Sequence, residues 1–327
     1  MQYASLGRTG CKVSRFCLGT MNFGPHASET DSFVIMDKAI ELGINFFDTA
    51  DVYGWKKGEG VTEQIVGNWF AQGGGRRDKV ILATKVFGDM NSDAADLTMA
   101  RGLNAVKIRR ACDNSLRRLK TDYIDLYQMH HISRETPWEE IWQAMETLVT
   151  QGKILYCGSS NFAGWHIATA NQEARTRNFL GLVCEQCKYS LATRAVESDV
   201  LPACRYYGVG VIAYSPLEGG ILGGVLKEGD RKRRNNENAQ RKIEQIRGQL
   251  EKWEAFCFKR GQRPADVALA WVLGNAALTA PIIGPRTLEQ LTGAVGAFDV
   301  QLDADALKQL DAIWPGPGGE APECFAW

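Results

Sequence analysis

The sequence lacks an excess of charge of either sign, because 38 Lys and Arg residues balance 38 Asp and Glu residues over 327 positions. A formal net charge of zero creates no overall field that attracts polyanions, so we expect no nucleic-acid partner. The one basic run, between Lys227 and Lys242, is interleaved with Glu228, Asp230 and Glu237. That mixture is typical of a solvated loop and helix face.

Long uninterrupted apolar runs are also missing. The most apolar stretch, residues 267–284, contains Gly274, Asn275 and Pro281. Because these residues break a helix, the stretch predicts the end of a helix followed by a short buried strand, and no membrane partner. The opening residues MQYASLGRTGCKVSRF contain no apolar core of the kind that a secretory signal needs, so we expect a cytoplasmic location.

Paired cysteine spacings are absent as well. The nine cysteines are an odd number scattered along the chain, which argues against a disulfide framework and fits free thiols in a reducing cytoplasm. Cys184 and Cys187 form a CxxC, but a redox or zinc site needs the pair at a helix start or a second pair downstream. Here LVCEQCKYS has the pattern of a strand and no second pair follows. We therefore expect buried, inert thiols and no metal site.

A glycine-rich GxGxxG does not follow the first predicted strand, which counts against a Rossmann-type sheet. The sequence instead alternates strand and helix patterns eight times after a short hairpin pattern at residues 3–5 and 12–14. This predicts an α/β fold, a (β/α)8 TIM barrel with an N-terminal β-hairpin, in one domain spanning residues 1–327. A doubly wound open sheet is the alternative. The expected strands are residues 14–21, 45–50, 79–86, 123–130, 154–161, 182–190, 209–216 and 279–284, and the helix of the sixth unit is expected at 195–206.

Four polar residues follow successive predicted strands at the points where those strands end. Asp48 ends the second strand in NFFDTADVYG, and Tyr53 lies five residues further on. Lys85 ends the third strand in KVILATKV, and His130 ends the fourth in DYIDLYQMH. Taken alone, Asp48 fits a helix cap or loop anchor and Lys85 a surface position. Tyr53 alone fits a packing role, and His130 a structural histidine. Since barrel active sites lie at the C-terminal ends of the strands, the four together predict a catalytic group.

The chemistry of this set favours reduction of a carbonyl group. A tyrosine hydroxyl has a reference pKa of about 10 and is a weak proton donor at neutral pH. We expect Lys85 to lower the pKa of Tyr53, and Asp48 to hold Lys85 charged and oriented. The imidazole of His130 can hydrogen-bond a carbonyl oxygen that gains negative charge. No side chain supplies hydride, so the set implies a nicotinamide cofactor.

The motifs NFFDTADVYG, LATKV, DLYQMH, GSSNF and AYSPL, in this order, resemble those of the aldo-keto reductases. The resemblance extends from LGRTG to IIGPRT, nearly the whole chain. It implies an NADPH-dependent reductase of a small-molecule carbonyl substrate on a (β/α)8 barrel. It also implies that Tyr53 is the proton donor, that Lys85 and Asp48 tune it, and that His130 orients the substrate carbonyl.

The same resemblance implies where the nicotinamide end of the cofactor binds. Ser160 and Asn161 of GSSNF, with Gln186 of CEQC, match the family's carboxamide contacts. Tyr214 of AYSPL matches the ring that stacks on the nicotinamide. Two further cofactor positions lie in LGTMNFG, Thr20 and Met21.

For the phosphate and adenosine ends, the resemblance implies a turn whose backbone N–H groups hold the diphosphate. Gly284, Arg286 and Gln290 match the adenosine end, where Arg286 can fork onto a ribose 2′-phosphate, so NADPH is preferred over NADH. By the same resemblance, either Arg233 or Arg234 in the long loop is a candidate to fold over the phosphates. The residues of the diphosphate turn are Ser215, Pro216, Leu217 and Gly219.

The sequence departs from the family pattern after Gln290. Relatives carry Glu and Asn three and four residues later as adenine contacts, whereas this chain has Gly293 and Ala294. We therefore expect weaker adenine binding, or contacts from elsewhere.

The substrate is less well defined than the chemistry. LGTMNFG, MHH and GSSNFAGW most resemble the bacterial branch that contains nucleotide-deoxysugar ketoreductases, and a general aldehyde and ketone reductase is equally compatible. Trp55, His131 and Trp165 are candidates for the pocket wall or for packing. A second reading is an NADP-binding regulatory subunit of the potassium-channel β-subunit type with little turnover. The sequence leaves the oligomeric state open.

Overall fold

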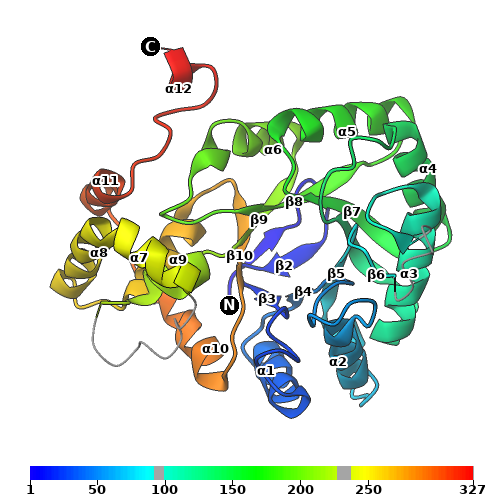
Figure 1. The fold of residues 1–327 in the computed structure, drawn as a ribbon, viewed down its shortest axis with the longest axis horizontal. Coiled ribbons are helices and arrows are strands. Elements are labelled where there is room, and N and C mark those ends of the chain that lie inside the picture. The colour runs from blue at the N-terminus through cyan, green and yellow to red at the C-terminus, as the bar shows by residue number, and fades with distance from the viewer. Residues whose placement is uncertain (92–98, 227–236, 327) are drawn as a thin grey trace.

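The computed structural model describes residues 1–91, 99–226 and 237–326, and it contains the predicted barrel (Figure 1). Eight parallel strands close on themselves in the order β10-β3-β4-β5-β6-β7-β8-β9. All but β3, β4 and β9 have six or seven residues, and nearly every strand residue is buried, as expected for a sheet covered by helices. The strands are β3 (Cys17–Gly19), β4 (Phe46–Asp48), β5 (Ile81–Val86), β6 (Ile124–Met129), β7 (Ile154–Ser160), β8 (Leu182–Lys188), β9 (Gly210–Tyr214) and β10 (Leu278–Ile283).

An antiparallel hairpin covers one end of the barrel. It consists of β1 (Tyr3–Ser5) and β2 (Lys12–Ser14), as predicted. Its turn contains Gly7 at φ +56°, where a Cβ would come within 2.3 Å of the Val183 oxygen and 2.8 Å of the Gly208 oxygen. Those two residues lie at the N-terminal ends of β8 and β9, so the hairpin covers the end opposite the predicted site.

Helices surround the strands, as Figure 1 shows, and local sequence signals fix where they begin. For example, the side chain of Asn104 accepts a hydrogen bond from the Lys107 N–H at the start of α3. Two C-terminal helices, α11 and α12, had no counterpart in the sequence-based expectation. The helices are α1 (Glu29–Glu41), α2 (Val61–Phe70), α3 (Ala105–Leu119), α4 (Trp138–Thr150), α5 (Gly164–Thr176), α6 (Val200–Tyr207), α7 (Glu237–Gln245), α8 (Arg247–Lys259), α9 (Pro264–Gly274), α10 (Leu288–Ala294), α11 (Ala304–Ile313) and α12 (Glu323–Ala326).

The single helix expected at residues 195–206 is wrong. A 3-10 turn, η3 (Ala195–Glu197), precedes α6, and the chain leaves helical geometry at Asp199, whose φ and ψ are −139° and −41°. The Asp199 carboxylate accepts a hydrogen bond from the Gly164 N–H at 2.9 Å. Asp199 therefore satisfies the N-terminus of α5, and this contact competes with continuation of its own helix.

The core has two parts. A large cluster lies between the strands and the surrounding helices, and a smaller cluster fills the barrel interior with residues such as Phe46, Ala83 and Leu126. The hairpin residues Leu6 and Val13 belong to the inner cluster. Within the described residues, no helix is both long and apolar enough to cross a membrane.

Candidate active site

Neighbouring strands bring the four predicted catalytic residues to one rim of the barrel. Asp48 is the last residue of β4, Lys85 is the penultimate residue of β5, and His130 directly follows β6. Tyr53 lies in the turn after β4, where its backbone N–H donates to the Ala50 oxygen at 3.2 Å. All four therefore lie at the C-terminal ends of parallel strands.

The ammonium group of Lys85 is at the centre of this group. Its Nζ lies 2.6 Å from Asp48 Oδ2, 3.2 Å from Tyr53 Oη and 2.8 Å from the Thr49 oxygen. Lys85 is completely buried, and Asp48 is 2% exposed, whereas Tyr53 is only half-buried. A buried ammonium with three acceptors is held in one position, and one of those acceptors is the phenol.

Two carboxamides fix the other oxygen of Asp48. Oδ1 accepts from Gln128 Nε2 at 3.0 Å and from Gln186 Nε2 at 2.9 Å. Gln186 thus contacts Asp48 in this structure, a role not expected from the sequence. Gln128 was missed altogether, although a carboxamide in an otherwise apolar strand is the same signal that marked Gln186.

The pKa of Tyr53 differs from the sequence-based expectation. Burial raises it above its usual value, and the Asp48 carboxylate adds to this rise, whereas Lys85 acts in the opposite direction without cancelling it. Burial lowers the pKa of Lys85, but Asp48 and Tyr53 together raise it by more than burial lowers it, so the net shift is upward. Lys85 therefore lowers the pKa of Tyr53 as expected, but burial outweighs this effect and the net shift is upward. The phenol stays protonated and the ammonium stays charged at neutral pH.

His130 is neutral in this environment. Burial, with the positive charge of Lys85 and the neighbouring His131, lowers its pKa to about 2. Its ring lies edge-on to that of Tyr53, with centroids 5.9 Å apart, and parallel to the ring of His131 at 5.1 Å. A neutral imidazole keeps one N–H donor, so His130 can hydrogen-bond a substrate oxygen but cannot act as an acid.

The predicted nicotinamide residues meet at the ends of β7, β8 and β9. The backbone N–H of Asn161 donates to the Gln186 oxygen at 2.9 Å, and Asn161 Nδ2 donates to Ser160 Oγ at 3.0 Å. Tyr214 Oη donates to Asn161 Oδ1 at 2.8 Å. After β3, Thr20 is buried and its hydroxyl donates to the backbone oxygen of Asp48 at 2.9 Å, whereas Met21 is exposed.

The predicted diphosphate turn has an unusual backbone. Ser215 has a φ of +54° and Glu218 a φ of +50°, and Gly219 and Gly220 are also left-handed. Glycine adopts this conformation without strain, but serine and glutamate rarely do. Pro216 and the other turn residue, Leu217, lie between the two strained positions.

At the predicted adenosine end, side chains fix the loop after β10. Asn22 Nδ2 donates to the Gly284 oxygen at 2.8 Å, and Gln290 Oε1 accepts from the Arg286 N–H at 2.8 Å. The guanidinium of Arg286 is exposed and has no ion-pair partner in the described part of the chain. Arg234 lies outside the described residues.

The departure from the family pattern at Gly293 has a structural correlate. The guanidinium of Arg263 donates to the Gly293 oxygen and also forms two hydrogen bonds of 2.7 Å to the Asp266 carboxylate. A Cβ at position 293 would lie 3.1 Å from Arg263 Nη1. The missing side chain therefore leaves room for Arg263 beside α10.

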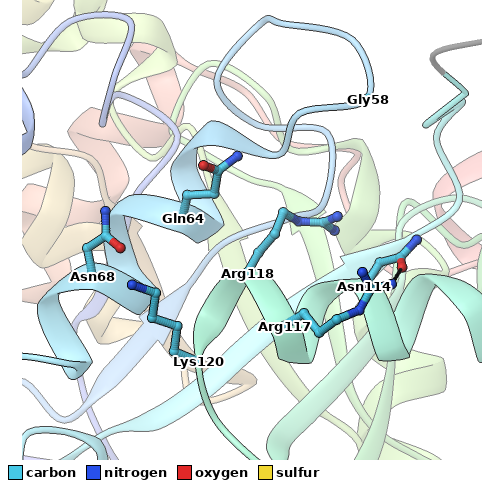
Figure 2. A pocket seen from close by; sticks show the side chains of 7 residues that line it. All are labelled: Gly58, Gln64, Asn68, Asn114, Arg117, Arg118 and Lys120. Carbon is cyan, nitrogen blue, oxygen red and sulfur yellow. Dashed lines mark hydrogen bonds between the residues drawn. The ribbon is translucent and has the colours of Figure 1, made fainter.

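A cavity of about 540 Å³ opens between α2 and α3 on the outside of the barrel (Figure 2). Arg118, which lies in its middle, is fixed by a 2.7 Å bond from Nε to the Glu63 carboxylate. None of the lining residues is a predicted catalytic or cofactor residue, so this cavity does not belong to the site described above. The lining residues are Gly58, Gln64, Asn68, Asn114, Arg117, Arg118 and Lys120.

The CxxC pair is buried, as predicted. Cys184 and Cys187 are free thiols inside β8, and burial holds the pKa of each well above its usual value. Such thiols stay protonated and unreactive. Among the described residues, no group of three His, Cys, Asp or Glu side chains is arranged to hold a metal ion.

Comparison with known proteins agrees with this architecture. The model of the aldo/keto reductase family matches residues 15–315, which is most of the chain. This chain belongs to the aldo/keto reductase family. It is 56% identical to an uncharacterized oxidoreductase, YrpG, of Bacillus subtilis, over the full length of both proteins.

Two fungal relatives in the family carry names that state an activity. The chain is 34% identical to norsolorinic acid reductase B of Dothistroma septosporum, covering 98% of this chain and 83% of that protein. It is 30% identical to versiconal hemiacetal acetate reductase of Aspergillus parasiticus, covering 97% and 99% respectively. Membership and these relatives make the chain an oxidoreductase of the aldo/keto reductase type.

Proposed function

We propose that this protein is an NADPH-dependent reductase that converts an aldehyde or ketone to the alcohol, with Tyr53 as the proton donor. The observation that carries the proposal is the shared ammonium of Lys85, which lies 2.6 Å from Asp48 and 3.2 Å from Tyr53 Oη. Two relatives named as reductases support the direction of the reaction. The nine free cysteines support a location in the reducing cytoplasm.

The residues present fit a dinucleotide cofactor. Asn161 and Ser160 present polar groups beside Tyr214, whose ring is half-buried at the end of β9. The turn after β9 is left-handed at Ser215 and at Glu218, and turns of this kind form concave sites that bind anions. Arg286 supplies an exposed guanidinium without an ion-pair partner in the described residues, which suits a ribose 2′-phosphate.

In the proposed reaction, Ser160, Asn161 and Tyr214 would hold a reduced nicotinamide, which would supply the hydride for the carbonyl carbon. The oxygen accumulates negative charge, and Tyr53 Oη transfers its proton to that oxygen. Lys85 stabilises the resulting phenolate across their 3.2 Å contact, and Asp48 keeps the ammonium in place. His130 stays neutral and donates a hydrogen bond to the same oxygen, which stabilises the charge as it forms.

The substrate wall that we propose includes two exposed aromatic residues. Trp55 is 65% exposed, with its ring edge-on to His26, and Trp165 is 61% exposed. Their exposure supports a place in the pocket wall, although each ring also contacts a histidine ring, His26 for Trp55 and His166 for Trp165. An aromatic wall with polar neighbours suits a sugar ring, and a nucleotide-linked keto-sugar is the substrate class that we propose to test first.

The experiment is steady-state NADPH oxidation with a panel of aldehydes, ketones and nucleotide-linked keto-sugars. Lys85→Met serves as the control for contaminating reductases, because it removes the ammonium at the centre of the site. We expect turnover with the parent, loss with the variant, and a lower KM for NADPH than for NADH.

The same panel also tests the regulatory-subunit alternative. Tight NADPH binding without turnover of any carbonyl compound would favour that alternative. No binding of NADPH or NADH by calorimetry would contradict the proposed function itself.

A further inference from the structure

One carboxylate in the turn after β9 collects four hydrogen bonds. Glu218, whose side chain is 2% exposed, accepts from Lys188 Nζ at 2.5 Å and from Lys242 Nζ. It also accepts from Ser190 Oγ and Thr193 Oγ1, each at 2.9 Å. These donors come from the end of β8, the loop that follows it, and α7. Glu218 therefore ties the turn to three other segments.

The same residue has a strained backbone. Glu218 has a φ of +50°, and Ser215, three residues earlier, has a φ of +54°. Non-glycine residues keep such a conformation only where the surroundings hold it, and positions of this kind concentrate at functional sites. The four side-chain bonds to Glu218 hold this turn together with backbone bonds inside it, such as that from the Glu218 N–H to the Ser215 backbone oxygen at 2.8 Å.

The cluster also carries a net positive charge. Two ammonium groups face one carboxylate, and the carboxylate stays ionised: burial raises its pKa, but Lys188, Lys242 and Ser190 lower it to about 2. Lys188 and Lys242 are 37% and 39% exposed, so both reach solvent while Glu218 does not. Lys188 is paired in register with Tyr214, at the level of the proposed nicotinamide contact.

We propose that Glu218 is a positioning residue for the diphosphate of the cofactor. It holds the left-handed turn in its binding conformation and keeps the ammonium groups of Lys188 and Lys242 beside that turn. The inference rests on the proposed function, because it deepens the description of the same cofactor site. It adds a cation pair and its carboxylate anchor, none of which the sequence motifs indicated.

A purely stabilising ion-pair cluster would give a different result from a positioning one. Loss of a stabilising cluster lowers the melting temperature but leaves ligand affinity of the folded protein unchanged. A positioning cluster changes the affinity for every ligand that contains the diphosphate, and does so by a similar factor. Titration with NADPH, NADH and ADP-ribose by calorimetry separates these cases, because the diphosphate is common to all three.

The variant is Glu218→Gln, which keeps the shape and removes the charge. The matched control is Asp125→Asn, since Asp125 is also a buried carboxylate, bonded to Arg77 at 2.7 Å and to the Leu82 N–H at 2.9 Å, but lies away from the turn. We expect Glu218→Gln to raise the Kd of all three ligands by about tenfold or more. Asp125→Asn should leave the three Kd values unchanged. The KM for NADPH should rise by the same factor, without a fall in turnover at saturation.

A second variant keeps the test decisive if Glu218→Gln does not fold. Lys188→Gln alters a partly exposed side chain, and we expect weaker ADP-ribose binding with a shallower dependence on salt, because one cation is removed. Unchanged or tighter ADP-ribose binding in either variant, with the parent binding normally, would overturn the inference alone. If the parent binds none of the three ligands, the proposed function fails and the inference fails with it.

Discussion

At the scale of single residues, the charge states of Tyr53, Lys85 and His130 decide what the site can do. Burial raises the pKa of Tyr53, the Asp48 carboxylate raises that of Lys85 against the effect of burial, and the pKa of His130 falls to about 2. None of the three groups titrates near neutrality. In the proposed reaction the proton for the carbonyl oxygen therefore comes from Tyr53, and the neutral His130 is restricted to hydrogen bonding.

This assignment predicts the pH dependence of carbonyl reduction. We expect kcat/KM to be constant between about pH 6 and 9, because the three groups keep one protonation state there. Activity should fall only as the pH rises through the raised pKa of Tyr53, since the phenolate has no proton to give. The measurement is a pH profile of kcat/KM at saturating NADPH, and an inflection close to pH 6.5, the ordinary pKa of histidine, would show that His130 titrates.

Arg286 gives a second prediction at this scale. Its exposed guanidinium has no ion-pair partner in the described residues, and the loop that carries it is fixed by Gln290. We expect Arg286→Ala to raise the Kd for NADPH by about tenfold to a hundredfold, because charged hydrogen bonds contribute about 1.5–3 kcal/mol each. The Kd for NADH should stay unchanged. Equal losses for both cofactors would show that Arg286 does not contact the 2′-phosphate.

The sequence allowed the positions of the proposed catalytic residues to be predicted, but not their electrostatics. Asp48, Lys85 and His130 could be placed because each follows a short apolar strand, and the ends of parallel strands meet. The direction of the Tyr53 pKa shift could not be predicted, since it depends on how burial and the Lys85 charge balance in three dimensions. Gln128 carried the same signal as Gln186 and could have been found.

At the scale of elements, the loop between β4 and α2 contains a buried carboxylate that the catalytic account does not use. Asp51 is completely buried, and neither of its carboxylate oxygens has a hydrogen-bond partner in the described structure. Burial and Glu63 raise the pKa of Asp51 to about 7, while Lys107 and Arg118 lower it.

This carboxyl should make stability depend on pH. Between its ordinary value of 3.8 and about 7, the folded state keeps the Asp51 proton and the unfolded state loses it. The free energy of unfolding therefore falls as the pH rises through that window. We expect Asp51→Asn to be more stable than the parent at about pH 8, by a few kcal/mol at most, and equally stable at about pH 4. Urea unfolding at both pH values measures this, and a variant less stable at the higher pH would contradict it.

The elements themselves could be predicted wherever local signals acted alone, although the expected strand ends differ from the observed ones by up to three residues. The eight strands were predictable because each is a short apolar run between loops. The helix at residues 195–206 was not, because the Asp199 side chain bonds to Gly164 on another helix. Likewise, the four side chains that donate hydrogen bonds to Glu218 come from separate segments, so no local sequence pattern predicts these bonds.

At the scale of the whole molecule, we propose that residues 1–327 form one domain. The strands of the barrel close through β3 and β10, which lie near opposite ends of the chain. The hairpin adds Leu6 and Val13 to the interior cluster, so the N-terminus shares the core of the barrel.

A single domain predicts cooperative unfolding. We expect denaturant transitions followed by tryptophan fluorescence and by far-UV circular dichroism to coincide, because the closed sheet links all segments. Two separated transitions would show that part of the chain unfolds independently, and the one-domain proposal would then be wrong.

The most direct test of the whole account is the turnover of Tyr53→Phe at saturating NADPH and carbonyl substrate. The control is Tyr127→Phe, which removes another phenol whose hydroxyl donates to the Ile108 oxygen at 3.4 Å in the buried layer outside the site. We predict that Tyr53→Phe loses about a hundredfold to ten-thousandfold in kcat, with the Kd for NADPH unchanged, while the control keeps its turnover. A Tyr53→Phe variant that turns over as fast as the parent would contradict the assignment of the proton donor.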